Sequence, residues 1–202
     1  MPILIAPTAF QGLAHPEAEI ATVKAAGAAK TLMTLSTLST FSIEEVMAVA
    51  TGPVWFQLYV FKNRAISASL VKRAEGAGCK AIVFTVDAPR LGRRERDVRN
   101  QFRMPDDLSV KNLLPGGPQE FPHGTAGSAL APYITSLVDP ALTWKDIEWL
   151  TGITKLPVLV KGILRSDDGF LPSNTVPRES SFRTMVRGSW TPLQQLFRFC
   201  RR

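Results

Sequence analysis

The chain has 202 residues, of which 45% are apolar and 20% charged, and these proportions are typical of a globular protein with one sizeable core. They exclude disorder over the whole chain. A formal charge of +7 would suggest a nucleic-acid partner if it were spread evenly. Residues 171–202, however, hold six Arg and one Glu, which leaves a charge of only +2 on residues 1–170. We therefore expect no nucleic-acid partner, because binding through the tail would rest on charge alone.

The cysteines and the two terminal segments indicate which cell compartment to expect for this protein. Cys79 and Cys200 are too few for a disulfide framework and form no Cys-x-x-Cys pair, so a reducing compartment is expected. No Lys or Arg precedes Lys24, and a secretory signal needs such a basic region. No apolar run approaches the roughly 18 residues of a membrane span, so no membrane partner is expected. Cytoplasm and peroxisome both stay open as the localisation. The last three residues (CRR) are not a peroxisomal address of the Ser-Lys-Leu type.

Over residues 1–168, short apolar runs alternate with helical patterns, which is typical of βαβ units that form a parallel sheet. Five strands, apolar nearly throughout as strands covered on both faces must be, are expected over residues 2–7, 31–35, 54–60, 81–86 and 157–161. Helices are expected between them, over residues 16–29, 42–50, 64–77 and 143–150. Ser42 and Glu45 predict a capping box at the start of the second helix.

Two stretches break this alternation. The connection over residues 90–140 is rich in Gly and Pro, and loops of such length are functional or disordered, so both alternatives stay open for residues 114–127. After Asp168 no helical or strand period is sustained, apart from a short amphipathic piece at residues 193–199. We predict an α/β domain over residues 1–168 and a divergent basic tail, without structure, over residues 169–202.

Candidate functional residues cluster at the ends of the predicted strands. Glycine-rich nucleotide loops, zinc-protease motifs and hydrolase elbows are absent, and with only two histidines no metal site is expected. Polar side chains follow the strands at their carboxyl ends, where an α/β barrel binds ligands: Thr8, Ser36, Gln57, Tyr59, Thr85, Asp87 and Lys161. A Ser or Thr there is by itself more typical of a turn. Lys161 is more informative, because a lysine that closes an apolar strand needs an anionic ligand or a carboxylate nearby.

Four segments carry a resemblance to a known family: residues 5–9 (IAPTA), 56–60 (FQLYV), 85–94 (TVDAPRLGRR) and 159–163 (LVKGI). They resemble the FMN-dependent 2-hydroxy acid oxidases, the glycolate oxidase-like family, over roughly residues 1–168. The resemblance implies a TIM (β/α)8 barrel, of which this chain would form about the first five strands. It also implies a flavoprotein oxidoreductase that oxidises a small (S)-2-hydroxy acid, glycolate or L-lactate, to the 2-oxo acid with oxygen as acceptor.

The resemblance also assigns roles to individual residues. The FMN ring would be held by Lys161 together with Pro7, Thr8, Ala9, Ser36, Gln57 and Thr85. Lys161 would lie beside N1 and O2 of the ring, where its charge favours the anionic reduced flavin. Tyr59 would hydrogen-bond the substrate, and Arg94 would pair with its carboxylate in a fork geometry. Asp87 would orient the catalytic base.

Several family features have no counterpart in this sequence. The family's base is a histidine in a Ser-Asn-His-Gly-x-Arg-Gln motif beyond the lysine-bearing strand, and the phosphate-binding segments follow it. We therefore name no catalytic residue and leave open whether this chain is by itself an enzyme. Little turnover is expected, because loss of a general base costs about 10²- to 10⁴-fold. The alternative is a catalytically incomplete, truncated or mis-spliced family member with at most a binding or modulating role.

The predicted strands also bear on partners. Five strands of an eight-stranded barrel would leave open edges at the first and the fifth strand. Two kinds of chain would cover such edges: a second copy, which gives a homo-oligomer, or a full-length relative. Degradation of an unpartnered chain is the remaining outcome.

Overall fold

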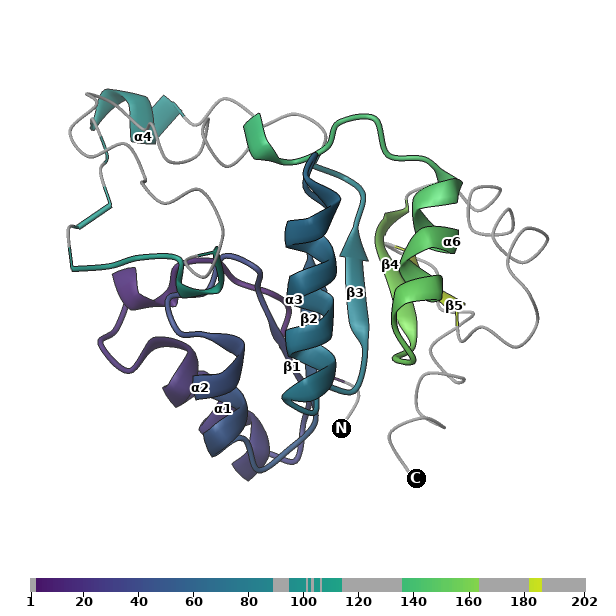
Figure 1. Ribbon diagram of the computed structural model, residues 1–202. Coiled ribbons are helices and arrows are strands. Elements are labelled where there is room, and N and C mark those ends of the chain that lie inside the picture. The colour runs from purple at the N-terminus through teal and green to yellow at the C-terminus, as the bar shows by residue number, and fades with distance from the viewer. Residues whose placement is uncertain are drawn as a thin grey trace.

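The computed structural model describes residues 3–88, 95–100, 102, 104–105, 107–113, 136–163 and 182–186. Within these ranges five strands form one parallel sheet in the order β1 to β5 (Figure 1). The elements are η1 (Gln11–Leu13), α1 (Ala18–Ala28), β1 (Met33–Leu35), α2 (Ile43–Val49), β2 (Val54–Leu58), α3 (Arg64–Gly76), β3 (Ile82–Thr85), α4 (Glu95–Arg99), η2 (Lys111–Leu113), α6 (Trp144–Ile153), β4 (Val158–Ile163) and β5 (Phe182–Val186). No helix in the described part of the chain is both long and apolar enough to cross a membrane.

The predicted helices and four of the five predicted strands are confirmed, with small shifts at their ends. α1, α2, α3 and α6 correspond to the four expected helices, and β1 to β4 to the second to fifth expected strands. The capping box also forms: Glu45 N–H donates to Ser42 Oγ at 3.2 Å, and Ser42 N–H donates to Glu45 Oε2 at 2.7 Å. It satisfies two backbone donors at the start of α2 that the helix itself cannot pair.

The first expected strand, residues 2–7, is reduced to a single parallel bridge between Ile5 and Met33 of β1. Ile5 N–H donates to Leu32 O, and Thr34 N–H donates to Ile5 O, both at 2.9 Å. Pro7 follows two residues later and has no N–H to donate, so the ladder stops there. The segment nevertheless runs beside β1, which places the residues after it at the carboxyl end of the sheet.

β5 was not among the expected strands. Residues 182–186 pair in parallel with β4, from Val158↔Phe182 to Ile163↔Val186. The structure thus differs here from the unstructured tail that the sequence predicts, and the edge of β4, expected to be open, is paired. A sheet edge offers unpaired N–H and C=O groups that accept an extended segment whatever its side-chain pattern. The amphipathic piece at 193–199 and residues 114–127 lie outside the described residues, and the division at residue 168 stays a prediction.

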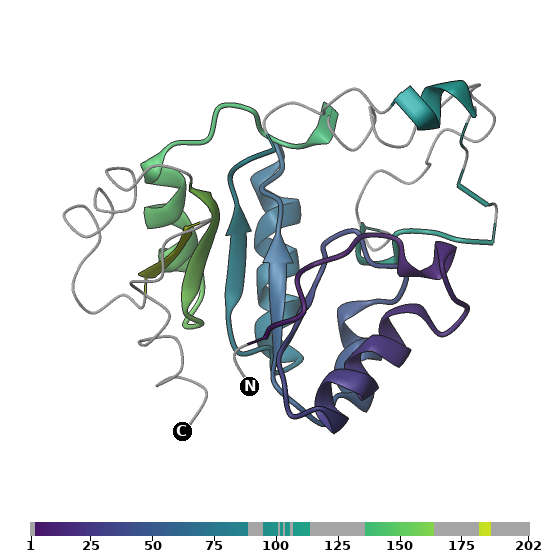
Figure 2. The ribbon, with the colours of Figure 1, turned by 180° about the vertical axis from the view of Figure 1, so that it is seen from behind.

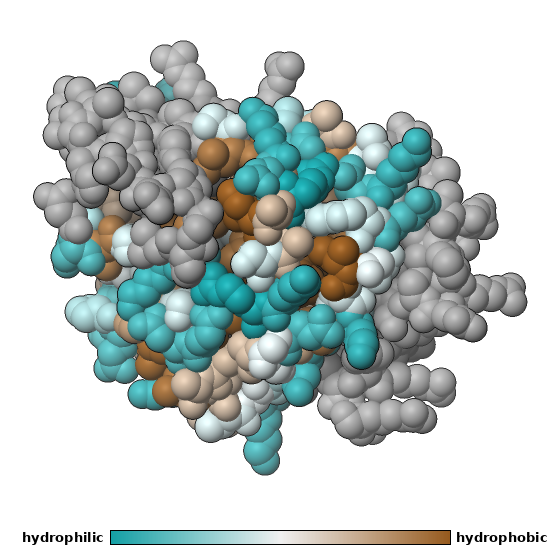
Figure 3. All heavy atoms as spheres, viewed as in Figure 1, coloured by the Kyte–Doolittle hydropathy of each residue, from teal (hydrophilic) through white to brown (hydrophobic). Residues whose placement is uncertain are grey.

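The two faces of the sheet are both buried but differ in character. Helices pack on one face, and from behind the strands lie in front of α3 (Figure 2). The main core joins helix residues to alternate strand residues, among them Val23, Val46, Leu70, Leu150, Met33, Phe56, Phe84 and Val160. The intervening strand residues form a second buried cluster on the opposite, inner face, which comprises Leu32, Trp55, Ala81, Val83 and Leu159. On the outside of the helices, hydrophilic side chains alternate with small hydrophobic patches (Figure 3).

Gly162 shapes the carboxyl end of β4. Its φ of +111° lies in the region that favours glycine, and the pairing with β5 shifts register between Lys161 and Ile163. A Cβ at Gly162 would lie 2.5 Å from Asp87 Cβ and 2.8 Å from Asp87 N. Only glycine therefore lets the segment after β3 approach β4 so closely, and this approach brings Asp87 next to Lys161.

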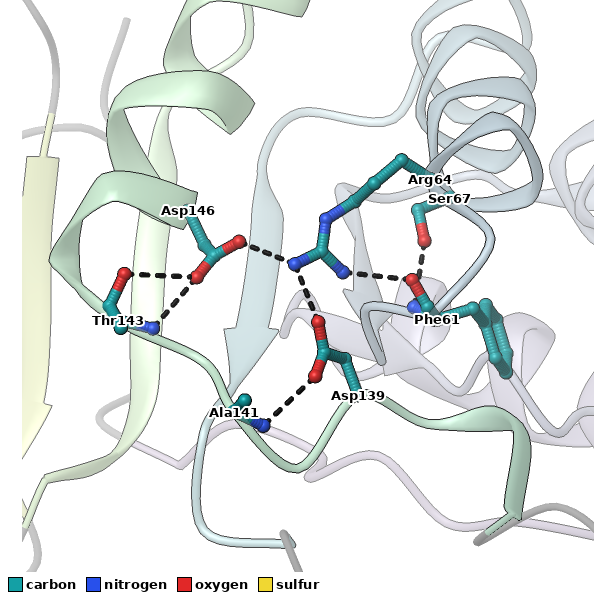
Figure 4. Close-up of polar contacts among 7 residues, drawn as sticks. All are labelled: Phe61, Arg64, Ser67, Asp139, Ala141, Thr143 and Asp146. Carbon is teal, nitrogen blue, oxygen red and sulfur yellow. Dashed lines mark hydrogen bonds and ion pairs between the residues drawn. The ribbon is translucent and has the colours of Figure 1, made fainter.

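Arg64, the first residue of α3, joins the end of the long connection to α6 and to the segment that follows β2 (Figure 4). Its Nη2 atom donates to Asp139 Oδ2 at 2.7 Å and to Asp146 Oδ1 at 2.6 Å, while Nη1 donates to Phe61 O at 2.8 Å. Asp146 Oδ2 also accepts from the N–H of Thr143 at 2.7 Å, which caps α6. We call Arg64, Asp139 and Asp146 the Arg64 cluster.

The backbone around Asp139 is fixed to the strand end as well. Asp139 N–H donates to Val60 O at 2.9 Å. The N–H of Ala141, together with the Arg64 guanidinium, holds the pKa of Asp139 below its usual range. The long connection thus returns to the sheet beside the residues that follow β2.

Arg64→Met would leave two mostly buried carboxylates without their cation, so we expect the free energy of unfolding to fall by about 2 kcal/mol. Urea denaturation at neutral pH measures this loss. Arg99→Met is the matched control, since the Arg99 and Glu95 side chains are 74% and 62% exposed. Its effect should stay below about 0.5 kcal/mol. Equal losses in the two variants would show that the Arg64 cluster is not a stabilising contact.

The stability difference between wild type and Arg64→Met should also depend on pH. Folding lowers the pKa of Asp139 from its ordinary value of 3.8, first through the Ala141 N–H, which the variant keeps, and then through Arg64. The part of the stabilisation that Arg64 supplies is present above that value and is lost as the pH falls through the lowered one. Denaturation curves measured from about pH 6 down to about pH 2 should therefore converge. A difference that stays constant over this range would contradict the ion-pair assignment.

Gly162→Ala places a Cβ at a positive φ and against Asp87, so it should destabilise the protein by at least about 2 kcal/mol. Gly152→Ala is the matched control, because a Cβ there, in the last turn of α6, meets open space. Helix propensity predicts that this control gains up to about 1 kcal/mol. Thermal melts compare the two variants, and an unchanged midpoint for Gly162→Ala would refute the close approach.

Candidate functional site

Along three neighbouring strands, the inner face of the sheet changes from apolar to polar toward the carboxyl end. Trp55, Val83 and Leu159 are buried in the inner cluster, and two residues after each of them come Gln57, Thr85 and Lys161. Alternate residues of a strand share a face. The register pairs Val83 with Leu159 and Thr85 with Lys161. Gln57 pairs with Val83, one step earlier along the sheet, and its side chain reaches Thr85. We call Gln57, Thr85 and Lys161 the polar layer.

Gln57 is the centre of a buried network at this end of the sheet. Its Nε2 donates to Thr85 Oγ1 at 2.9 Å, and its Oε1 accepts from Ser36 Oγ at 3.3 Å and from Thr37 N–H at 3.2 Å. The structure therefore brings together Ser36, Gln57 and Thr85, three predicted site residues from the ends of three strands. Because these polar groups satisfy one another, the network holds a defined geometry away from water.

Thr37 belongs to this network although the sequence analysis did not select it. It is buried, and its Oγ1 donates to Gln57 O at 2.5 Å and accepts from Tyr59 N–H at 3.2 Å. These bonds fix the backbone of Tyr59, the predicted substrate-binding residue, at the end of β2. The one signal in the sequence was the position of Thr37 directly after Ser36, at the end of an apolar strand.

Asn112, from η2 of the long connection, is a second residue that the sequence analysis missed. It is buried, its Oδ1 accepts from Ile43 N–H at 2.9 Å, and its Nδ2 donates to Ser39 Oγ at 2.7 Å. Asn112 thus holds the loop between β1 and α2, on which Ser36 lies. No local pattern marks it, because these partners lie about seventy residues earlier in the chain.

Lys161 contacts Asp87 at the point where Gly162 lets the segment after β3 lie close to β4. Its Nζ lies 3.2 Å from Asp87 Oδ2 and 3.3 Å from Oδ1, and the two side chains are 36% and 41% exposed. Of the two partners expected for Lys161, the carboxylate is therefore present. An ion pair this exposed contributes at most about 1 kcal/mol to stability. Since its ammonium is also partly exposed, Lys161 can contact a ligand at the rim as well as Asp87.

The other predicted residues lie near this rim or outside the described residues. Pro7, Thr8 and Ala9 follow the Ile5 bridge, and the next residue, Phe10, donates its N–H to Leu38 O of the β1–α2 loop at 3.0 Å. Arg94 lies outside the described residues, so its expected contact with a substrate carboxylate stays a prediction. His15 accepts from Glu17 N–H at 3.1 Å through Nδ1, which is a structural role at the start of α1.

The arrangement suits a planar group with a hydrogen-bonding edge. An ammonium, a carboxamide and hydroxyls lie at the same end of the inner face, and the residues that precede them on the strands are apolar. Pockets for small molecules and cofactors combine an apolar lining with a few placed polar groups in this way. Within the described residues, no three His, Cys, Asp or Glu side chains gather as a metal site would require.

Comparisons with known proteins agree on one family. The model of the family described as FMN-dependent dehydrogenase matches residues 1–171. Glycolate oxidase 3 of Arabidopsis thaliana is 52% identical over 170 residues, which cover 83% of this chain and 45% of the plant protein. Glycolate oxidase of Spinacia oleracea is 50% identical over 173 residues, which cover 85% of this chain and 46% of the relative. The chain thus spans about half the length of these relatives.

Solved structures give the same result for the fold. Mandelate oxidase with (S)-4-hydroxymandelic acid superposes with a TM-score of 0.78 at 40% identity, over 91% of this chain and 50% of that chain. A mutant of the active chimera of (S)-mandelate dehydrogenase superposes with a TM-score of 0.73 at 33% identity, over 86% of this chain and 49% of that chain. The parallel sheet with helices on one face is therefore part of a TIM barrel. The chain belongs to the FMN-dependent dehydrogenase family.

Proposed function

We propose that this chain binds the ring of FMN at the polar layer and that it serves the oxidation of a small (S)-2-hydroxy acid, glycolate or L-lactate, to the 2-oxo acid with oxygen as acceptor. The polar layer is the observation that carries this proposal. On three adjacent strands the inner face is apolar up to Trp55, Val83 and Leu159. Two residues further along come Gln57, Thr85 and Lys161, at the end of the sheet where barrels of this kind bind ligands.

The chemistry of these side chains fits the edge of a flavin ring. That edge alternates acceptors with one N–H donor, and the rim offers the Lys161 ammonium together with the carboxamide and hydroxyls of the Gln57 network. When bound, FMN supplies the acceptor for the hydride that leaves the substrate. Lys161 would place a positive charge beside the ring, and Asp87 would hold that ammonium in position. The expected role of Asp87 in orienting a catalytic base stays a prediction.

The substrate side of the proposal rests on Tyr59 and Arg94. Thr37 fixes the Tyr59 backbone at the rim, next to the Gln57 network, and this position supports a contact between Tyr59 and the substrate. Arg94 would add the pairing with the substrate carboxylate. The relatives are named for glycolate and mandelate, both 2-hydroxy acids, which supports this substrate class.

Cofactor binding and turnover are separate properties of this chain. Among the described residues the one histidine, His15, is engaged at the start of α1, so we assign no general base. Oxygen consumption by the FMN-loaded chain with glycolate, or with L-lactate, would show whether it oxidises a substrate alone or acts as a binding module.

Titration of the purified chain with FMN, followed by flavin fluorescence and the visible spectrum, should show saturable binding. Lys161→Met removes the charge at the ring edge, so we expect FMN affinity to fall by about tenfold or more. Lys155→Met, an exposed residue just before β4, is the matched control and should bind as wild type does. Absence of saturable binding, or equal affinity in all three proteins, would refute the proposed site.

A further inference from the structure

Glu19 is a buried carboxylate in the first turn of α1 that the proposed function does not use. It has no exposed surface, and it accepts four hydrogen bonds. Oε1 accepts from Gln11 N–H at 3.2 Å and from Thr40 N–H at 3.0 Å, while Oε2 accepts from Thr40 Oγ1 at 2.6 Å and from Phe41 N–H at 3.2 Å. None of these donors is charged, so within the described part of the chain the carboxylate is held by backbone and hydroxyl groups.

The donors belong to two segments that meet at the rim of the sheet. Gln11 begins η1, directly after the stretch that contains Pro7, Thr8 and Ala9. Thr40 and Phe41 end the loop that starts at Ser36 after β1. Glu19 therefore joins the two segments that carry four of the seven residues expected to hold the flavin ring.

The number of acceptors explains why a carboxylate is needed at this position. An ionised Glu has two oxygens that only accept, whereas Gln has one such oxygen and an NH₂ group that only donates. In Glu19→Gln, the NH₂ group would face a backbone N–H in either orientation, that of Phe41 or those of Gln11 and Thr40, and one loop would lose its anchor. Burial of a charge is costly, and four hydrogen bonds offset that cost only while both segments stay in place.

We propose that Glu19 is a positioning residue for the flavin ring: it sets the spacing between the segment after Ile5 and the loop after β1. This inference rests on the proposed function. Glu19 does not touch the ring; it acts through the backbone of Gln11, Thr40 and Phe41. Its effect should therefore be visible in how the ring is held as well as in the stability of the fold.

The test compares Glu19→Gln with Glu17→Gln, an exposed residue two positions earlier in the chain. Both proteins are titrated with FMN under conditions in which circular dichroism shows them folded. Glu19→Gln should bind FMN about tenfold more weakly and shift the visible spectrum of the bound flavin, because a displaced rim loop changes the hydrogen bonds to the ring. Glu17→Gln should match wild type in both measurements.

Thr40→Val covers the case in which Glu19→Gln does not fold. It keeps the carboxylate and the backbone donors but removes one hydroxyl. A smaller loss of FMN affinity, with a spectral shift in the same direction, is expected. Wild-type affinity and spectrum in Thr40→Val, or in a folded Glu19→Gln, would overturn the inference.

The controls separate this inference from the proposed function. If Lys161→Met weakens FMN binding while Glu19→Gln and Thr40→Val bind as wild type does, only the role of Glu19 is wrong. If wild type itself shows no saturable FMN binding, both the proposed function and the role of Glu19 are wrong. A loss of stability in Glu19→Gln without any change in FMN affinity or spectrum would show a purely structural role.

Discussion

Parallel pairing between β3 and β4 sets Thr85 opposite Lys161, and the rest of the site depends on this register. A slip of one residue would turn Lys161 toward the helices and a core valine toward the rim. The close contact of Gly162 with Asp87 holds the strand ends together at this point, since a side chain at residue 162 would push the segment after β3 away. A single glycine thus links the geometry of the sheet to the position of the one lysine in the polar layer.

Around this register, buried polar residues hold the loops that follow the strands. The β1–α2 loop is buried although it is rich in Ser and Thr, and its anchors come from distant parts of the chain: Gln57, Asn112 and Glu19. Such networks rigidify a structure when every member is satisfied and are costly when one is removed. They favour a site whose shape is set before a ligand arrives, and preorganised sites bind with less loss of conformational entropy.

Local patterns predicted most of the fold. Apolar runs, helical patterns and a capping box marked β1 to β4 and the four helices, because helix and strand periods are short-range signals. The same reasoning brought Ser36, Gln57 and Thr85 together, since parallel strands end at one edge. Local patterns could not reveal the roles of Glu19, Asn112 and the Arg64 cluster, because their partners lie 8 to 82 residues away. They could not reveal β5 either, because an open sheet edge accepts a strand without a side-chain pattern.

If the polar layer is the FMN site, the bound ring should perturb the amides around Gln57. Nuclear magnetic resonance spectra of the ¹⁵N-labelled chain, recorded as FMN is added, report each amide separately. We predict that the side-chain amide of Gln57 and the backbone amides of Ser36 and Thr37 shift together as binding saturates. Amides in α6, such as that of Thr151, should stay unmoved because α6 packs on the other face of the sheet. Shifts confined to the helices, or a Gln57 side-chain amide that does not respond to saturating FMN, would contradict binding of the ring at the polar layer.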